Sequence, residues 1–131
     1  MRALYLDSSA FVKVLIAEPE SGALREFLST RPERRVSSAI LRTEALRAVR
    51  HLGPDALATV RNGVRNVDLV AIDDRILDAA GVLEPRILRT LDAIHVATAL
   101  SIGDDLVEIV TYDDRMAEAA RLLGLQTTSP Q

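Results

Sequence analysis

The sequence of 131 residues contains no cysteine and no tryptophan, and it has only two phenylalanines and two tyrosines. Without cysteine the chain can form neither disulfide bonds nor thiolate metal sites, and it cannot use a thiol as a nucleophile. The scarcity of aromatic side chains also leaves no evident platform on which the bases of single-stranded nucleic acid could stack. Any metal ion must therefore be held by oxygen or imidazole ligands.

Long apolar runs are also missing. No stretch approaches the roughly 18 apolar residues that a membrane-spanning helix needs. Asp7 interrupts the apolar N-terminal stretch too early for a signal peptide. We therefore expect a cytoplasmic protein that has no membrane partner.

Length and composition favour one domain that covers residues 1–131. A chain of this length can bury about two-thirds of the surface that it exposes when unfolded. Because 48% of the residues are hydrophobic and few are aromatic, the core must consist mainly of Leu, Val, Ile and Ala. Such a core suits helices packed on a short sheet.

The charged residues are spread unevenly along a chain whose formal net charge is −3. Segment 31–65 holds eight arginines and three acidic residues, a balance of +5, so the rest of the chain carries −8. Arginine suits bidentate contacts to phosphate, which would fit a nucleic-acid partner. The same side chains could equally serve to solvate a helical surface.

Apolar periodicity and turn signals divide the chain into alternating strands and helices. Strands are predicted at 3–6, 36–38, 67–72 and 108–112, with an edge strand at 125–128. Helices are predicted at 10–17, 20–28, 39–52, 55–66, 74–80, 89–100 and 116–123. This alternation predicts an α/β/α sandwich, in which helices cover both faces of a short, mainly parallel sheet of four to five strands.

Four acidic residues occupy unusual positions. Asp7 and Asp113 each follow a predicted strand, and parallel strands would bring both to the carboxyl edge of the sheet, where open α/β folds bind ligands. Glu44 and Asp92 interrupt apolar faces of predicted helices. Asp92 alone could be explained as a helix-start residue that the helix dipole favours. Taken together, however, the four side chains could meet in one place.

Four carboxylates gathered in one pocket would repel one another strongly. Two of them about 5 Å apart cost roughly 3 kcal/mol at an effective dielectric constant of about 20. Such a cluster is stable only if it is protonated or binds a cation, and oxygen ligands without cysteine select Mg²⁺ or Mn²⁺. These ions support phosphoryl transfer in which water is the nucleophile.

Four segments of the sequence, in this order, resemble a known family. They are Leu-Asp-Ser-Ser-Ala-Phe-Val-Lys at 6–13, Glu44 on its predicted helix, Leu-Asp-Ala-Ile-His-Val-Ala-Thr-Ala at 91–99 and Thr-Tyr-Asp-Asp-Arg-Met at 111–116. Over nearly its whole length the chain is similar to the PIN domain, and more closely to the VapC toxins of bacterial toxin–antitoxin pairs.

The resemblance implies a metal-dependent endoribonuclease that cleaves single-stranded or looped RNA. It implies that Asp7, Glu44, Asp92 and Asp113 are catalytic and hold Mg²⁺, for which Mn²⁺ can substitute. Glu44 would act either through a water molecule or as a base. The family's Thr-x-Asp pattern selects Asp113, which leaves Asp114 as the expected helix cap.

The resemblance also implies two protein partners, a second copy of the chain in a homodimer and a small cognate antitoxin. We expect the antitoxin to place an apolar segment near Leu24, Phe27 and Leu28. A basic side chain of the antitoxin would then reach the acidic residues.

Four further polar residues lie in or near these segments. Ser8 and Thr111 are expected to hydrogen-bond the carboxylates or a metal-bound water, although helix capping explains Ser8 equally well. His95, one helical turn from Asp92, could reach the site, but a packing role is favoured because a lone histidine on a helix more often packs. Lys13 is expected to be either a surface residue or a phosphate contact.

Other functions compete with the ribonuclease hypothesis. A phosphoacceptor signalling domain would also combine α/β alternation with an acidic Mg²⁺ site, but it needs a lysine late in the chain, and the only lysine is Lys13. A noncatalytic binding module would use its acidic pocket to receive basic residues of a partner. A nuclease that cleaves DNA would use the same metal chemistry as one that cleaves RNA.

Overall fold

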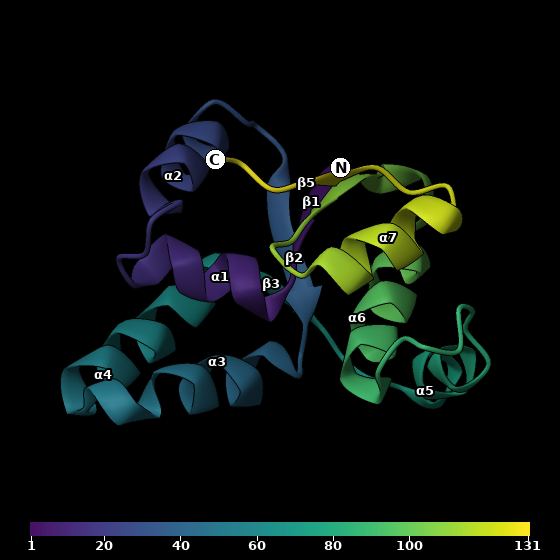
Figure 1. The fold of residues 1–131 in the computed structure, drawn as a ribbon, viewed down its shortest axis with the longest axis horizontal. Coiled ribbons are helices and arrows are strands. Elements are labelled where there is room, and N and C mark those ends of the chain that lie inside the picture. The colour runs from purple at the N-terminus through teal and green to yellow at the C-terminus, as the bar shows by residue number, and fades with distance from the viewer.

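The computed structural model describes residues 1–131, and its centre is a five-stranded sheet with helices on both sides (Figure 1). Every strand pair is parallel, and the strand order is β3-β2-β1-β4-β5. The strands are β1 (Ala3–Leu6), β2 (Arg34–Ser38), β3 (Asp68–Val70), β4 (Leu106–Val110) and β5 (Thr127–Thr128). The predicted α/β/α sandwich with a short parallel sheet is therefore confirmed, including its edge strand near the C-terminus.

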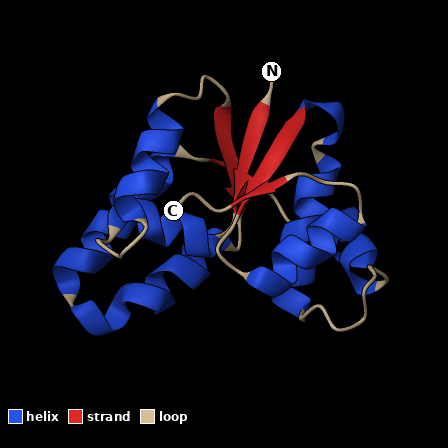
Figure 2. Cartoon of the chain, turned by 45° about the horizontal axis from the view of Figure 1, so that its top comes forward, coloured by secondary structure: helices blue, strands red, loops and turns tan.

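Helices from the two halves of the chain cover opposite faces of this sheet (Figures 1 and 2). One face carries α1 (Ser8–Leu15), α2 (Ser21–Ser29), α3 (Leu41–Val49) and α4 (Pro54–Gly63). The other face carries α5 (Asp74–Gly81), α6 (Thr90–Ser101) and α7 (Asp114–Leu122). Short 3₁₀ turns follow α3, α4 and α6, at Arg50–Leu52, Val64–Asn66 and Gly103–Asp105. None of the helices is both long enough and apolar enough to cross a bilayer.

Alternate residues of the central strand β1 serve the two halves of the core. Ala3 and Tyr5 pack in a cluster with α6 and α7, whereas Leu4 and Leu6 pack in a cluster with α1 and α2. All four residues are buried, as expected for a strand of a parallel sheet that is covered on both faces. A third cluster joins α1 to α3 and α4 around Phe11.

The predicted caps of α1 and α7 are wrong by one residue. Asp7, rather than Ser8, caps α1, because its Oδ1 atom accepts a hydrogen bond from the backbone N–H of Ala10. Asp113, rather than Asp114, caps α7 in the same way. Asp7 follows β1 directly, whereas Thr111 and Tyr112 separate β4 from Asp113. The extended backbone of each aspartate points its short side chain at the free N–H groups of the helix that follows.

The buried stripe of α3 also differs from the prediction. It consists of Leu41, Ala45 and Val49 and does not include Glu44, which was predicted to lie on an apolar face. Packing against α1 and α4 selects these three side chains. Glu44 consequently lies at the half-buried edge of the helix rather than in the middle of its packing face.

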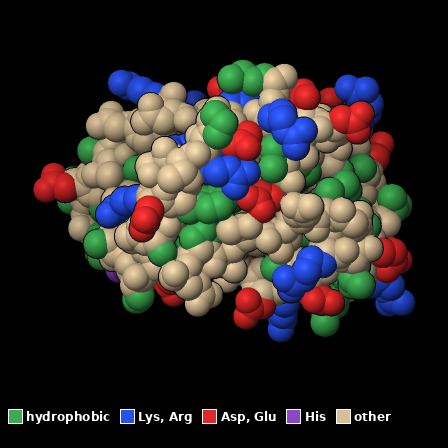
Figure 3. Space-filling view, turned by 90° about the horizontal axis from the view of Figure 1, so that it is seen from above, with side chains coloured by type: hydrophobic (Ala, Val, Ile, Leu, Met, Phe, Trp, Pro, Cys, Tyr) green, Lys and Arg blue, Asp and Glu red, His purple; other side chains and the backbone are tan.

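The turn between α3 and α4 depends on a glycine. Gly53 has a φ of +96°, in the left-handed region that side chains rarely adopt, and Pro54 follows as the first residue of α4. The turn joins α3 and α4 into a helical hairpin, and several arginines of these two helices are exposed. On the face in Figure 3, basic and acidic side chains are interspersed, so this face carries no continuous basic surface.

The carboxyl ends of the strands converge on one edge of the sheet, where the arrowheads in Figure 2 come together. β1 and β4 are neighbours there, since Leu6 pairs with Val110 and the N–H of Asp7 donates to the carbonyl of Val110 at 3.3 Å. The two strand-end aspartates therefore leave the sheet side by side.

Candidate active site

Asp7 is the most deeply buried of the four candidate acids, with an exposed fraction of only 3%. Its Oδ1 atom accepts hydrogen bonds from the Ala10 N–H at 3.0 Å and from Ser9 Oγ at 2.7 Å. Its Oδ2 atom accepts a hydrogen bond from Thr111 Oγ1 at 2.5 Å. Burial raises the pKa of Asp7, and these three donors only partly oppose that effect.

Thr111 connects the two strand-end aspartates. Its hydroxyl donates to Asp7 and accepts a hydrogen bond from the backbone N–H of Asp113 at 3.0 Å. Asp113 Oδ1 is occupied by the first-turn N–H groups of Arg115 and Met116, while its Oδ2 receives no hydrogen bond from the protein. The expected hydrogen bond from Thr111 to a candidate carboxylate is therefore present.

Asp92 has no hydrogen-bond or ion-pair partner in the protein, although it is half-buried in the first turn of α6. Burial raises its pKa first of all, and the charges of Asp113, Asp7 and Glu44 raise it further, against a smaller opposing effect of His95. The four candidate acids are thus close enough to interact electrostatically. The helix begins at Thr90, one residue after the predicted start, and Asp92 lies in its first turn.

Glu44 reaches the same region from α3, on the opposite side of the sheet. Its Oε1 atom accepts a hydrogen bond from Ser8 Oγ at 2.6 Å and contacts His95 Nε2, also at 2.6 Å. Burial raises the pKa of Glu44, but the hydrogen bonds from His95 and Ser8 together outweigh burial and leave the pKa below its ordinary value. Glu44 therefore remains a carboxylate at neutral pH.

The candidate acids line two hollows, whereas the sequence suggested a single pocket. Asp92 and Asp113 line a polar hollow of about 220 Å³, together with Arg89, Asp114 and Arg115. Glu44 lines a different hollow of about 560 Å³, whose lining is half apolar. No group of three or more acidic or histidine side chains is placed to hold one metal ion. The strand ends bring the acids near enough to interact electrostatically, although Glu44 lines a different hollow from Asp92 and Asp113.

The sequence favoured the wrong role for His95. A packing role was preferred to a role in the site, yet His95 contacts Glu44 and the hydroxyl of Tyr5 on β1. A signal was available: His95 lies one helical turn after Asp92 in a helix that is apolar on nearly every other side. A polar ring buried there must find hydrogen-bond partners.

Lys13 is neither a surface residue nor free to contact a phosphate. Its ammonium group lies 2.8 Å from Glu20 and 3.3 Å from Glu18, and it sits 4.7 Å from the centre of the Tyr112 ring. The side chain is buried by these contacts. The two glutamates follow the end of α1, so the sequence pattern concealed this pairing.

The apolar face of α2, which was expected to receive an antitoxin, is largely buried in the protein. Leu24 and Leu28 are buried in the cluster beneath α2 and cannot receive a partner. Phe27 is only partly exposed, and the Arg31 guanidinium lies 4.9 Å from the centre of its ring. The apolar face of α2 is therefore used by the core of the protein itself.

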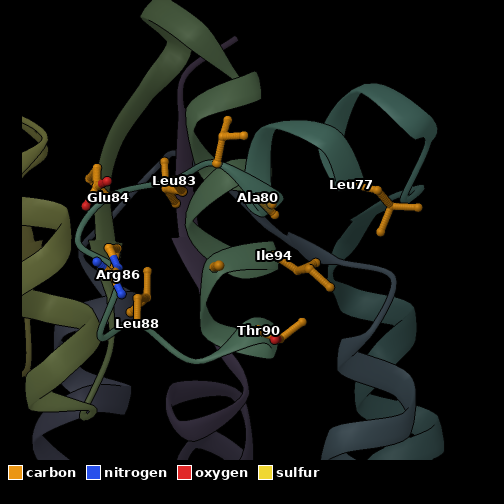
Figure 4. Close-up of a pocket in the computed structure, with 11 residues that line it drawn as sticks. Leu77, Ala80, Leu83, Glu84, Arg86, Leu88, Thr90 and Ile94 are labelled. Atoms are coloured by element: carbon orange, nitrogen blue, oxygen red, sulfur yellow. The ribbon is translucent and has the colours of Figure 1, made fainter.

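A separate hollow of about 390 Å³ lies between α5, the segment that follows it and α6 (Figure 4). Its lining is mainly apolar and includes Leu77, Leu83, Leu88 and Ile94. None of the four candidate acids lines it. The chemistry suggested by the acids therefore belongs to the carboxyl ends of β1 and β4 and not to this hollow.

Comparison with known proteins places these features in a family. The family model "PIN domain" matches residues 4–122. Ribonuclease VapC46 of Mycobacterium tuberculosis is 52% identical over 130 residues, which cover 99% of each chain. Ribonuclease VapC35 of the same organism is 40% identical over 97% of this chain and 96% of its own.

Solved structures support the same fold. The crystal structure of Mycobacterium tuberculosis VapC20, described as a sarcin–ricin loop cleaving toxin, superposes with a TM-score of 0.74 at 15% identity and covers 88% of this chain and 94% of its own. A toxin–antitoxin complex from Klebsiella pneumoniae contains a chain with a TM-score of 0.74 at 20% identity and 98% coverage of both. With matches that span almost the entire sequence, this chain belongs to the PIN-domain family and, within it, to the VapC proteins.

Proposed function

We propose that this protein is a Mg²⁺- or Mn²⁺-dependent endoribonuclease that hydrolyses phosphodiester bonds in single-stranded or looped RNA. We further propose that it is the toxin of a toxin–antitoxin pair. The single observation that carries the catalytic proposal is Asp92, a half-buried carboxylate without a partner, whose pKa is raised by burial and further by three other carboxylates. A cation would relieve this repulsion. The names of the relatives, each called a ribonuclease VapC, support RNA as the substrate.

The available oxygen atoms suit magnesium better than an ion that needs a complete protein cage. Mg²⁺ is usually bound by one or two carboxylates, and waters and substrate phosphates supply its other ligands. Asp92 and Asp113 share one hollow, and both retain oxygens without hydrogen bonds. This fits a site that is completed by water and RNA. When bound, the ion would activate water and stabilise charge on the phosphate and the leaving oxygen.

Each acidic residue has a distinct proposed role. Asp92 and Asp113 would hold the ion directly. Asp7, held by hydrogen bonds from Thr111, Ser9 and Ala10, would add negative charge that favours binding of the ion. Glu44 Oε2 receives no hydrogen bond from the protein, so it is the atom available to orient the attacking water and accept its proton.

RNA would be held mainly through its phosphates. Arg89 and Arg115 line the hollow that contains Asp92 and Asp113, both are exposed, and neither forms an ion pair. Their positions fit contacts to the phosphates on either side of the cleaved bond. No aromatic side chain lines this hollow, so base stacking would contribute little there.

The cleavage proposal can be tested with end-labelled single-stranded RNA and DNA of the same sequence, incubated with Mg²⁺, Mn²⁺ or EDTA. We expect cleavage of RNA with either metal, no cleavage with EDTA, and at least a 100-fold loss in Asp92→Asn. Asp78→Asn is the matched control, because Asp78 is an exposed aspartate on α5. Equal cleavage by wild type and Asp92→Asn would refute the assignment, and preference for the DNA strand would refute RNA as the substrate.

A noncatalytic binding module is the second candidate function, because no three acidic side chains are placed around one ion. In that case the chain would bind a basic partner and would cleave neither nucleic acid with any metal. The phosphoacceptor hypothesis is weaker, since its required lysine is absent and Lys13 is occupied by Glu18 and Glu20.

We also propose a small cognate antitoxin as the protein partner, in line with the toxin–antitoxin complex among the structural neighbours. The half-apolar hollow beside Glu44, between α1 and α3, is now the expected place for its apolar segment. A basic residue of the antitoxin could then reach Glu44. Co-expression with the product of a small neighbouring gene should yield a complex that does not cleave RNA.

A further inference from the structure

His95 is almost completely buried, with an exposed fraction of 1%, yet both of its ring nitrogens have partners. Nδ1 lies 2.7 Å from Tyr5 Oη, and Nε2 lies 2.6 Å from Glu44 Oε1. Ser8 Oγ donates to the same glutamate oxygen at 2.6 Å. Side chains from β1, α1, α3 and α6 therefore form one connected hydrogen-bond network at the candidate site.

The direction of these hydrogen bonds follows from the chemistry of the groups. A carboxylate only accepts, so His95 Nε2 must donate its proton to Glu44. In a neutral imidazole with the proton on Nε2, Nδ1 is an acceptor, and the Tyr5 hydroxyl must donate to it. The Tyr5 ring meets the His95 ring edge to face, with 5.8 Å between ring centres, which limits rotation of the imidazole. The network thus runs from Tyr5 through His95 to Glu44.

This network holds Glu44 across the boundary between the two helical layers. Glu44 belongs to α3 on one side of the sheet, and His95 belongs to α6 on the other. A glutamate side chain is flexible, and a single serine hydroxyl would restrain only part of its motion. With both donors on Oε1, the remaining oxygen Oε2 has a fixed position and stays free of protein hydrogen bonds.

We propose that His95 is a positioning residue that acts through Glu44, holding its carboxylate so that Oε2 is presented to the metal-bound water. This inference rests on the proposed metal-dependent function, in which Glu44 Oε2 accepts the proton of that water. Tyr5 supports this role of His95 by fixing the tautomer and orientation of the imidazole. His95 itself touches neither RNA nor the ion.

The test compares His95→Leu with His95→Gln, because glutamine can place an N–H near the position of Nε2 and leucine cannot. We expect His95→Leu to lower kcat for RNA cleavage about 10- to 100-fold, the usual effect of removing a group that orients a metal-site residue. KM should change little, and His95→Gln should recover most of the lost activity. Thr98→Val is the control for a buried polar group on the same helix, and it should leave kcat unchanged.

A double-mutant cycle with Glu44→Gln isolates the proposed route. If His95 acts through Glu44, His95→Leu should cause little further loss of kcat in the Glu44→Gln background. An equal loss in both backgrounds would overturn the proposal, as would failure of His95→Gln to recover activity when it is folded.

Tyr5→Phe leaves His95 and Glu44 in place, so it remains informative if His95→Leu does not fold. We expect Tyr5→Phe to lower kcat, but by less than His95→Leu. An unchanged kcat would contradict the role of Tyr5.

A binding measurement separates failure of this inference from failure of the proposed function. The affinity for Mn²⁺, followed by electron paramagnetic resonance of the free ion, needs no RNA cleavage. We expect His95→Leu to weaken Mn²⁺ binding about 10-fold and Thr98→Val to leave it unchanged. Intact Mn²⁺ binding and intact kcat in folded His95→Leu would overturn the inference. Wild type that binds Mn²⁺ but cleaves no RNA would instead refute the ribonuclease proposal alone.

Discussion

At the scale of single residues, the unusual feature is a carboxylate that the protein leaves unsatisfied. Asp7 has three hydrogen-bond donors and Glu44 has two, whereas Asp92 has none and is repelled by the other acids. An unpaired, half-buried carboxylate lowers the free energy of unfolding when no cation is bound. Its presence in a helix that is otherwise largely apolar therefore points to a role in function.

Asp92→Asn should therefore stabilise the metal-free protein at neutral pH. The pKa of Asp92 in the folded state lies above its ordinary value of 3.8, so the folded state favours the protonated form. The destabilisation of the folded state by ionised Asp92 is absent below pH 3.8. It grows as pH rises from 3.8 to the folded-state pKa and is complete above that pKa. We expect the Tm in EDTA at pH 7 to rise by roughly 2–4 °C, the effect of less than about 1 kcal/mol in a domain of this size.

Thermal unfolding followed by circular dichroism, at several pH values, measures this effect. The gain should shrink as pH falls toward 4, and saturating Mg²⁺ should reverse the order by stabilising wild type more than the variant. A variant that is less stable than wild type in EDTA at pH 7 would show that Asp92 is not under electrostatic strain.

The two arginines beside Asp92 allow a second test at this scale. Arg89→Gln or Arg115→Gln should weaken RNA binding and reduce the slope of log K against log salt concentration by about 0.7 for each lost phosphate contact. Arg61→Gln, an exposed arginine on α4, is the control. Binding isotherms at several salt concentrations with the Asp92→Asn protein, which does not cleave, provide the measurement. Unchanged slopes in both variants would place the RNA elsewhere.

At the scale of elements, the site results from two parallel strands that end together. The sequence was sufficient to predict both strands, the helices after them and the acids at their ends, because a short apolar run that ends at an aspartate before a helical pattern is typical of a strand-to-helix junction. It was not sufficient to predict the helix caps, since Asp113 and Asp114 can each perform that role. The pairing of His95 with Glu44 was also hidden, because it depends on how two layers of helices meet across the sheet.

Thr111 joins these two strand ends, so its hydroxyl should matter more than its size. Thr111→Val removes a donor from the buried Asp7 carboxylate and should lower the free energy of unfolding by about 1–3 kcal/mol at pH 7. Thr111→Ser retains the hydroxyl and serves as the control. Urea denaturation distinguishes the two variants. A smaller loss of stability in Thr111→Val than in Thr111→Ser would mean that the methyl group, rather than the hydrogen bond to Asp7, is what matters.

At the scale of the whole molecule, exposed apolar side chains gather in and after α5. Val82 is 82% exposed, Ile87 is 71% exposed, and Leu77 and Leu91 are also exposed. Leu77 and Val82 line the hollow of Figure 4, and Ile87 and Leu91 are the sequence neighbours of Leu88 and Thr90, which also line it. A sequence pattern cannot reveal such a surface, because the same residues would be buried if another segment of the chain covered them. The surface is a natural candidate for the proposed homodimer contact.

Ile87→Asp should therefore convert a dimer to a monomer, since a charge in the middle of an apolar interface loses its hydration. Leu122→Asp is the matched control, because Leu122 is 67% exposed on α7, outside this surface. Size-exclusion chromatography with light scattering gives the mass directly. Ile87→Asp that remains a dimer would place the interface elsewhere, and a monomeric wild type would refute the homodimer.

The proposed mechanism depends above all on a divalent cation that relieves the repulsion among acids from four different elements. An anomalous difference map from crystals grown with Mn²⁺, recorded at the manganese absorption edge, tests this most directly. We predict a peak within ligand distance of both Asp92 and Asp113. A well-ordered site that shows no peak there, in crystals that hold Mn²⁺ elsewhere, would contradict the central claim.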